Sequence, residues 1–526
     1  MILYKKSDIV KLNGDDIMKK LMSYMLLIAL CFVSMTVYAN ETIEYIDAES
    51  LVNSTLDMEF NMDDNIGVSL FSGEDTRADR YGRTVLASMD NSEVLLHAYD
   101  CFVAGVGSAS SEFYVNSDNG ALSPQELSVV AEVYVADYPE TFWFNGSLSY
   151  SVSNGEVIRA LPVYMLNGQT VDKTTIMTEK AKFDSAVDSI IQEMYQSVPE
   201  SESDYETQYG YALWLHDKVA DTVEYKFGPN HQSAYGVLVD KKAVCAGYSK
   251  AYQCLLNKVG IKAWSVKGQS VNPVTGAAEN HEWNLLWLDG NCVYVDITWD
   301  DQQQDIYHLY FARSLQEFSL DHVPFSGIYS NALPNGNDDK CQHSGYFEHT
   351  HSDNIITGEV TGEKIKSLFT QLGTSGIWDA VVYDPTGVNV GNWLSDQNNR
   401  WSMVPDSFTG SYCGFIFNNM GNTVQGVEYH ISVIDLDTTR LYLEDSSDKT
   451  ECNFRMVSGI DDMEKEYNLC VAFYDNNGAL MSLSIQQPPS YYQHMHINVP
   501  DGCDSYKVML MEGATIKPLC ESISIE

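Results

Sequence analysis

The sequence predicts an α+β protein in which helices and an antiparallel sheet precede a β-rich final third. Capping signals and apolar residues at helical spacing mark helices in the first half. A two-residue Asp289–Gly290 turn between two alternating apolar runs predicts a hairpin beside these helices. From Trp378 onward, short apolar runs alternate with turns, which is typical of strands. The 526 residues are 44% hydrophobic, enough for about three domains with packed cores.

The first 39 residues have the organisation of an export signal. Two lysines precede the apolar run 26–33, and Ala39 places a cleavage site before Asn40. The run is shorter than the about 20 apolar residues that a membrane-spanning helix needs. Met18 is an alternative start, which would make the residues before it an upstream extension. We therefore expect a secreted, extracellular protein.

The net charge is strongly negative. The chain has 31 basic and 73 acidic residues, a net charge of −42, and loss of the signal with its five Lys and three Asp leaves −44. Such a charge repels phosphate backbones and anionic headgroups. We expect no nucleic-acid partner and no membrane insertion after signal cleavage, while association with the cell surface or cell wall stays compatible with the pattern.

Three helices are predicted between residues 120 and 225. A capping box at Ser123 with Pro at the next position starts a helix that ends near Ala136. Apolar residues at helical spacing predict a second helix over 178–197. A cap at Ser203 starts a third, which reaches about Asp221.

The strand signals before residue 200 are short. Asn154–Gly155 predicts a hairpin that joins 147–153 to 156–165. Residues 40–120 are poorly patterned, with strand-like pieces at 94–96 and 112–115. The predicted organisation is a signal peptide, a mixed N-terminal extension, a central domain and a region of one or two β-sandwich modules, over 1–39, 40–198, 199–358 and 359–526.

Cys245 is the first candidate for chemistry. It falls at or near the start of an amphipathic helix that Gly260 ends. Unpaired N–H groups and the helix dipole at such a position stabilise a thiolate and could hold an oxyanion. Taken alone, the segment is more typical of a small buried hydrophobic residue, which most free cysteines are.

The hairpin after this helix provides a base. A two-residue loop pairs Leu288 with Asn291, which places His281 and Asp296 on one face as diagonal neighbours. Asp296 could then orient His281, while the other ring nitrogen deprotonates Cys245. A three-residue loop would break this arrangement. The alternation of side chains along the strand also allows Asp300 to be the orienting carboxylate.

Three motifs in this order resemble the transglutaminase-like superfamily, and more closely exported bacterial proteins that carry its domain. They are the runs 243–248 with Cys245, 281–284 with His281, and 294–300 with Asp296, separated by 36 and 15 residues. The resemblance implies a nucleophile at Cys245, a base at His281 and an orienting carboxylate at Asp296. It also implies a papain-like core, in which the nucleophile helix packs on an antiparallel sheet.

Other residues are weaker candidates for a role in the site. Gln232 could supply an oxyanion donor or be a surface amide. Five residues of metal-ligand type are spaced at i,i+2: Cys341, His343, His349, His351 and Asp353. Their spacing matches no standard zinc pattern, so an exposed loop is the simpler interpretation. Three tryptophans, Trp283, Trp287 and Trp299, are expected in the core or the cleft wall. No loop has calcium-ligand spacing, so no cofactor and no metal are expected.

The predicted activity is acyl transfer from amide bonds of peptides or proteins. Water as acceptor would make the protein a protease or deamidase, and an amine would make it a transglutaminase. The alternative is a non-catalytic adhesion scaffold at the cell surface, which the β-rich final third fits as well. An intact set of Cys, His and Asp in register favours the enzyme, because a scaffold does not need it.

Overall fold

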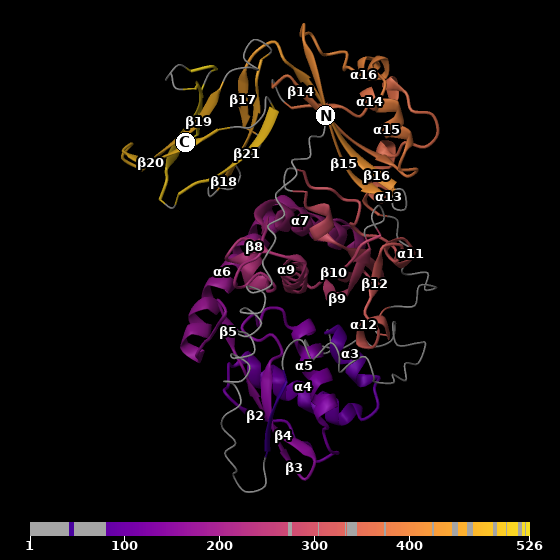
Figure 1. Ribbon diagram of the computed structural model, residues 1–526, viewed down its shortest axis with the longest axis vertical. Coiled ribbons are helices and arrows are strands. Elements are labelled where there is room, and N and C mark those ends of the chain that lie inside the picture. The colour runs from indigo at the N-terminus through magenta and orange to yellow at the C-terminus, as the bar shows by residue number, and fades with distance from the viewer. Residues whose placement is uncertain are drawn as a thin grey trace, which may run out of the picture.

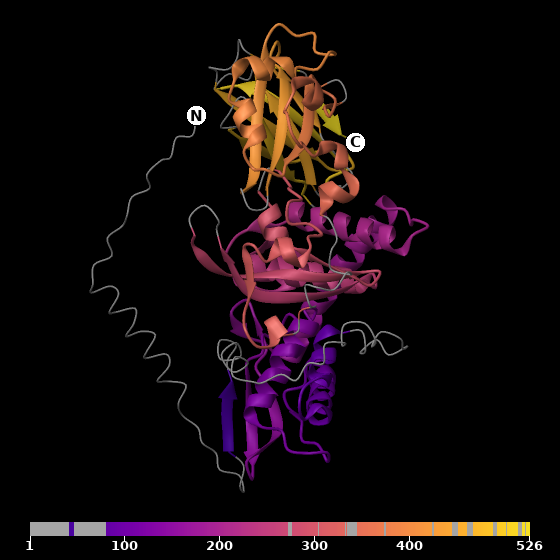
Figure 2. The ribbon, with the colours of Figure 1, turned by 90° about the vertical axis from the view of Figure 1, so that its right-hand side faces the viewer.

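The computed structural model describes most of the chain from Thr42 onward. The described residues are 42–46, 80–271, 276–302, 305–331, 333, 345–372, 375–422, 426–443, 451–459, 466–487, 492–500, 502–513, 518–520 and 522–525. The predicted signal peptide, Cys341 and His343 lie outside them. Three consecutive parts follow one another along the long axis (Figures 1 and 2).

The N-terminal part is a small sheet covered by helices. Its sheet has the order β1-β3-β4-β2, with bounds Thr42–Ile46, Leu148–Ser153, Glu156–Pro162 and Phe113–Tyr114 for β1, β3, β4 and β2. Its helices are α3 (Tyr81–Ala87), α4 (Ser92–Gly107) and α5 (Pro124–Asp137). The strand β2 and the hairpin about Asn154–Gly155 confirm the prediction.

Helix starts were accurate where the sequence analysis identified a cap, but the helix predicted over 178–197 starts earlier, at Lys173, with Asp172 as its cap. Ser123 and Glu126 form the predicted capping box of α5. The strand prediction at 94–96 is wrong, because these residues lie in α4, where Val94, Ala98 and Phe102 repeat at helical spacing on a buried face. An apolar run of three residues fits a strand or a helix equally well, and only the spacing of apolar residues over several turns distinguishes the two.

The middle part holds the long helices and a four-stranded antiparallel sheet. The helices are α6 (Lys173–Ser197), α7 (Asp204–Thr222), α8 (Ala234–Leu238) and α9 (Cys245–Lys258). The sheet has the order β11-β10-β9-β12, with bounds Asn291–Val295, Ala278–Leu288, Lys262–Val271 and His322–Pro324. Short elements complete it: β5 (Met165–Leu166), β6 (Gln169–Thr170), β7 (Glu224–Tyr225), β8 (Lys242–Ala243), α10 (Ile297–Asp300), α11 (Leu315–Phe318) and α12 (Ile328–Asn331).

The two faces of this sheet belong to different cores. Leu286 and Leu288 of β10 pack with α7, α8 and α9. Trp283, Leu285 and Trp287 of the same strand pack with the helices of the N-terminal part. Trp264 of β9 joins this second core and contacts the ring of Tyr81 with centroids 5.3 Å apart. The N-terminal part therefore shares a core with the sheet.

The third part begins with a sheet that carries short helices. The sheet has the order β13-β14-β16-β15, with bounds Thr370–Gln371, Ile377–Asp384, Gly426–Asp435 and Cys413–Asn422. Its helices are α13 (Tyr346–Thr350), the 3₁₀ turn η2 (Ser352–Asn354), α14 (Gly362–Lys366), α15 (Asn389–Leu394) and α16 (Gln397–Ser402). The prediction of an almost wholly β region after Trp378 missed α15 and α16. Val390 and Leu394, four residues apart, pack under the sheet from α15.

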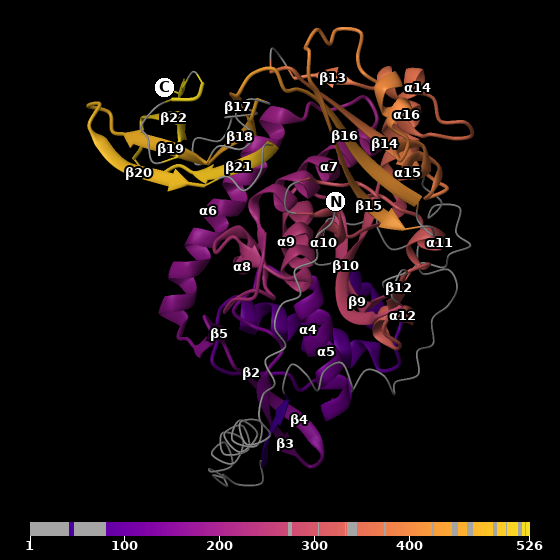
Figure 3. The ribbon, with the colours of Figure 1, turned by 45° about the horizontal axis from the view of Figure 1, so that its top comes forward.

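Two further sheets end the chain (Figures 1 and 3). One has the order β17-β18-β21, with bounds Arg440–Leu443, Glu451–Val457 and Tyr492–Asn498. The other has the order β20-β19-β22-β23, with bounds Leu480–Gln486, Tyr467–Tyr474, Ser505–Glu512 and Ile523–Ile525. Side chains of both meet in one core that includes Phe454, Val471 and Val508. Among the described residues, no helix is both long and apolar enough to cross a membrane.

We predict that Trp264→Ala lowers the free energy of unfolding by about 3–5 kcal/mol, because a fully buried indole leaves a cavity between the two parts that share it. Urea denaturation followed by circular dichroism measures this change. Glu279→Ala, at an exposed position of β10, is the matched control and should shift stability by less than about 0.5 kcal/mol. Equal effects for the two variants would contradict the shared core.

Candidate active site

Cys245 is the first residue of α9, as predicted. It is half-buried and a free thiol. The preceding Val244 caps the helix with no side-chain hydrogen bond, so the first-turn N–H groups are not used by a capping side chain. A Cβ on Gly247 would lie 2.6 Å from the His231 carbonyl oxygen, so only glycine allows the loop to pass this close to the helix start.

The hairpin after α9 has the predicted register. Leu288 pairs with Asn291 and Asn284 with Val295 across the Asp289–Gly290 turn. Both turn residues have positive φ, 46° and 78°, which the tightest hairpin turns require. This register brings His281 and Asp296 together, with 2.6 Å between His281 Nε2 and Asp296 Oδ2.

The Asp296 carboxylate accepts hydrogen bonds at both oxygens. Oδ1 accepts from the backbone N–H groups of Thr298 (3.0 Å) and Trp299 (3.3 Å) and so caps α10. Oδ2 faces the Nε2 atoms of His281 and His322, the latter at 3.1 Å. Burial disfavours the charged carboxylate, but the two histidines hold the pKa of Asp296 well below its usual range.

The His281 ring is correspondingly easy to protonate. Its burial disfavours the cation, but Asp296 and the Cys245 sulfur raise the pKa of His281 to about 10. Because Nε2 is committed to Asp296, Nδ1 is the nitrogen left for Cys245. A ring held in this way can carry the proton that a leaving group needs.

His322 was missed by the sequence analysis. It is 1% exposed, and its Nδ1 lies 2.6 Å from Asp321 Oδ1. The Tyr310 hydroxyl donates to the other oxygen of Asp321 at 2.7 Å. A continuous chain of hydrogen bonds therefore runs from Tyr310 through Asp321, His322 and Asp296 to His281. The three-residue strand β12 that carries His322 gave no pattern that would distinguish it from coil.

The other carboxylates of this segment are engaged elsewhere. Asp300 Oδ2 lies 3.2 Å from Nε2 of His216 and so does not orient His281. Asp301 accepts from the Tyr248 hydroxyl at 2.6 Å. Asp296 is therefore the carboxylate that the fold places on His281.

Other predicted candidates divide between core, cleft and surface. Trp283 and Trp287 are buried in the core, and Trp299 lies beside His281 with ring centroids 5.9 Å apart. Nε2 of His349 lies 3.3 Å from Glu206 Oε2, and Nε2 of His351 lies 3.2 Å from the Tyr346 hydroxyl.

Among the described residues, two groups hold ligand-type atoms within 4.8 Å of one another, and both are hydrogen-bonded networks. They are His281–Asp296–His322 and His216–Asp217–His308.

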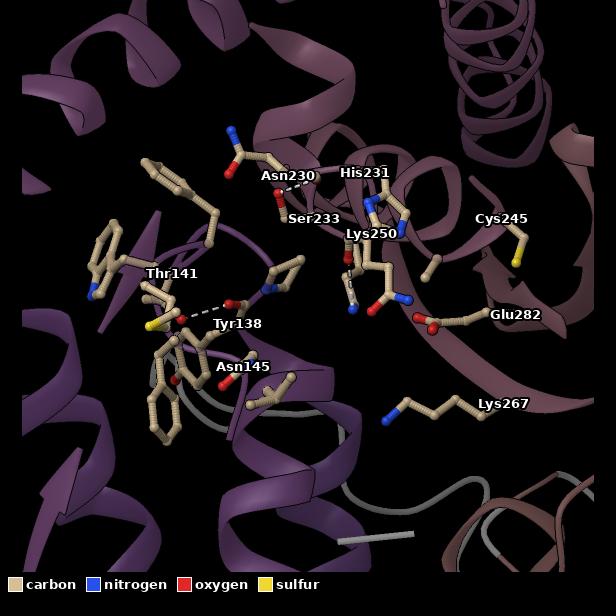
Figure 4. A pocket seen from close by; sticks show the side chains of 18 of the residues that line it. Tyr138, Thr141, Asn145, Asn230, His231, Ser233, Cys245, Lys250, Lys267 and Glu282 are labelled. Atoms are coloured by element: carbon tan, nitrogen blue, oxygen red, sulfur yellow. Dashed lines mark hydrogen bonds between the residues drawn. The ribbon is translucent and has the colours of Figure 1, made fainter. Parts of the chain in front are cut away.

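Cys245 and His281 line one pocket of about 470 Å³. The middle part forms one wall, and the other comes from the N-terminal part, with Tyr138, Phe142 and Trp143. Figure 4 shows Cys245 at the edge of this space, with Glu282 and Lys267 extending into it. Gln232 also lines the pocket, and its backbone carbonyl accepts from Lys250 Nζ at 2.9 Å. Its role as an oxyanion donor stays a prediction.

Comparison with known proteins supports one family. Residues 196–297, which include Cys245, His281 and Asp296, match the sequence model of the transglutaminase-like superfamily. A solved structure described as a TGase matches at 16% identity and a TM-score of 0.18, over 29% of this chain and 43% of that chain. An endonuclease/exonuclease/phosphatase from Beutenbergia cavernae DSM 12333 matches at 9% identity and a TM-score of 0.15, over 60% and 94%. The chain thus spans less than half of the TGase, and no curated protein matches it.

We predict that the His281 ring stays protonated to about pH 10 and that Asp296→Asn lowers this pKa, because the carboxylate favours the cation. Since the folded pKa lies above the unfolded value, this pair stabilises the fold fully below about pH 6.5, and the contribution is lost as pH rises through about 10. NMR of ¹⁵N-histidine-labelled protein across this range measures the titration. Asp301→Asn is the matched control, and an equal shift in both variants would contradict the assignment.

Proposed function

We propose, on the basis of the transglutaminase-like domain that the chain carries, that the protein is an exported cysteine-nucleophile acyl-transfer enzyme acting on amide bonds of peptides or proteins. The observation that supports this best is the placement of Cys245 and His281 on one pocket wall, with His281 Nε2 bonded to Asp296. Asp296 orients the ring and favours its cation, which is the role of the third member of a catalytic triad.

The first half of the reaction forms a thioester. At neutral pH His281 already carries the thiol proton of Cys245 on Nδ1, so the sulfur attacks the amide carbonyl carbon as a thiolate and forms a C–S bond. N–H groups at the start of α9 stabilise the negative charge on the carbonyl oxygen. The C–N bond then breaks, and the imidazolium gives its proton to the leaving amine or ammonia.

The second half releases the acyl group. Water or an amine attacks the thioester, His281 takes the proton of this nucleophile, and the C–S bond breaks as the proton returns to sulfur. Water gives a hydrolase of the protease or deamidase type, and an amine gives a transglutaminase. Both outcomes use the same three residues.

The architecture fits this proposal. We interpret α9 packed on the antiparallel sheet as a papain-like core, and the two facing sheets after residue 440 as a β-sandwich module. The N-terminal export pattern makes secretion, with association at the cell surface, the location proposed for this activity.

We predict that iodoacetamide modifies Cys245 preferentially at neutral pH and that His281→Ala slows this labelling at least about tenfold, because the ring accepts the thiol proton. Intact-mass and peptide mass spectrometry measure it. Cys254 of the same helix is an internal control, because burial raises the pKa of its thiol and keeps it unreactive. Random labelling, or an unchanged rate in His281→Ala, would count against the enzyme and for a scaffold.

We predict that His322 is a positioning residue that acts through Asp296. Its ring helps to lower the pKa of Asp296, so His322→Phe should move the acid limb of the Cys245 labelling profile to higher pH. His322→Gln keeps a donor toward Asp296 and should restore part of the wild-type profile. A uniform loss of labelling at every pH, alike in both variants, would indicate a structural role alone.

A further inference from the structure

The pocket wall beside Cys245 carries four charged side chains from four elements. Glu132 comes from α5, Lys250 from α9, Lys267 from β9 and Glu282 from β10, and all four line the pocket with the nucleophile. Glu282 and Lys267 extend into it from the same side in Figure 4. The triad uses none of these charges, and they sum to zero.

Both carboxylates are buried, and they are incompletely paired. Glu132 is 1% exposed and Glu282 is 6% exposed. Oε1 of Glu282 has no hydrogen-bond partner among the described residues. Glu132 lies beside the buried Tyr329, and its Oε1 is ion-paired with Lys267 at 3.7 Å. Buried charged oxygens are ordinarily paired, because an unpaired one costs the full desolvation of the group. Both side chains line the pocket that holds Cys245.

The ammonium groups are also loosely held. Lys267 Nζ stands 3.7 Å from Glu132 Oε1, too far for a hydrogen bond, and 5.5 Å from the centre of the Tyr329 ring. Lys250 Nζ donates to one carbonyl, which leaves two of its three donors for other partners. The wall thus offers acceptors for a cation beside donors for an anion.

We propose that this wall binds the free ammonium and the free carboxylate of a short peptide or amino-acid unit, so that the substrates are small and have free ends. An ammonium group would pair with Glu132 and Glu282, and a carboxylate with Lys267 and Lys250. The interior of a protein chain has neither charge and would offer these four side chains no group of opposite charge.

The dimensions of the site support a small ligand. Its volume of about 470 Å³ lies toward the lower end of the roughly 300–1,000 Å³ range of ligand pockets. The opposite wall offers the apolar side chains of Phe142 and Trp143, which suit the uncharged part of a peptide. This inference rests on the proposed function only for the statement that such a ligand is the substrate.

Calorimetric titration with the tripeptide Gly-Gln-Gly tests the proposal. The full chain with Cys245→Ala prevents turnover, and four forms of the peptide are compared: free, N-acetylated, C-amidated and blocked at both ends. We expect the free form to bind about tenfold more tightly than each singly blocked form, because each block removes one charged pair. Equal affinities for all four forms, or no binding of the free form, would overturn the proposal.

Substitutions in the wall separate the two charges. Glu282→Gln should remove the preference for a free amino group and keep that for a free carboxylate, and Lys267→Met should do the reverse. Glu132→Gln serves as a second test if Glu282→Gln does not fold. Glu279→Gln, exposed on the same strand, is the matched control. Parallel losses of both preferences in every wall variant would refute separate recognition of the two ends.

The outcomes distinguish this proposal from the proposed function. Iodoacetamide labelling of Cys245 that depends on His281, without any preference for free peptide ends, would retain the enzyme and reject the ligand class. A preference for free ends in a chain whose Cys245 is unreactive would reject the enzyme and retain a peptide-binding pocket.

Discussion

A carboxylate buried to 1% exposure, that of Asp296, is the constraint on which the middle of the molecule depends. A charge in such a place is tolerated only when its oxygens are fully paired. Pairing here requires the backbone of α10 on one oxygen and the rings of His281 and His322 on the other. The end of β11, the start of α10 and the positions of β10 and β12 are therefore linked through one group. Breaking one contact would leave the others around an incompletely paired charge.

The sheet that supports this carboxylate also divides two cores and closes the pocket. One face of β10 packs with α9, and the other packs with the N-terminal helices through Trp283, Leu285 and Trp287. The N-terminal part thereby gives Glu132 and an aromatic wall to the pocket that holds Cys245. Packing far from the thiol thus shapes the space into which a substrate would enter. This explains why a region without nucleophile or base belongs to the site.

Local signals predicted the parts of the site that short-range rules control. The Asp289–Gly290 turn sets the hairpin register, and the register brings His281 to Asp296. The capping box of α5 is equally local. The sequence did not indicate His322 as a site residue, because its strand has only three residues and is defined by pairing with β9. The sequence did not indicate Glu132 either, because it lies 113 residues before Cys245 and lines the pocket only as a result of tertiary packing. The short helices α15 and α16 were missed for a related reason, since a six-residue helix has too few turns for a clear period.

Direct trapping of an acyl-enzyme tests the central claim, that Cys245 is a nucleophile activated by the His281–Asp296 pair. The native chain is incubated with the p-nitrophenyl ester of a short peptide, quenched in acid, digested and mapped by mass spectrometry. The account predicts one acyl adduct, on the peptide that contains Cys245, which hydroxylamine removes and which is absent from Cys245→Ala. An adduct at another residue, or equal acylation in Cys245→Ala, would contradict it.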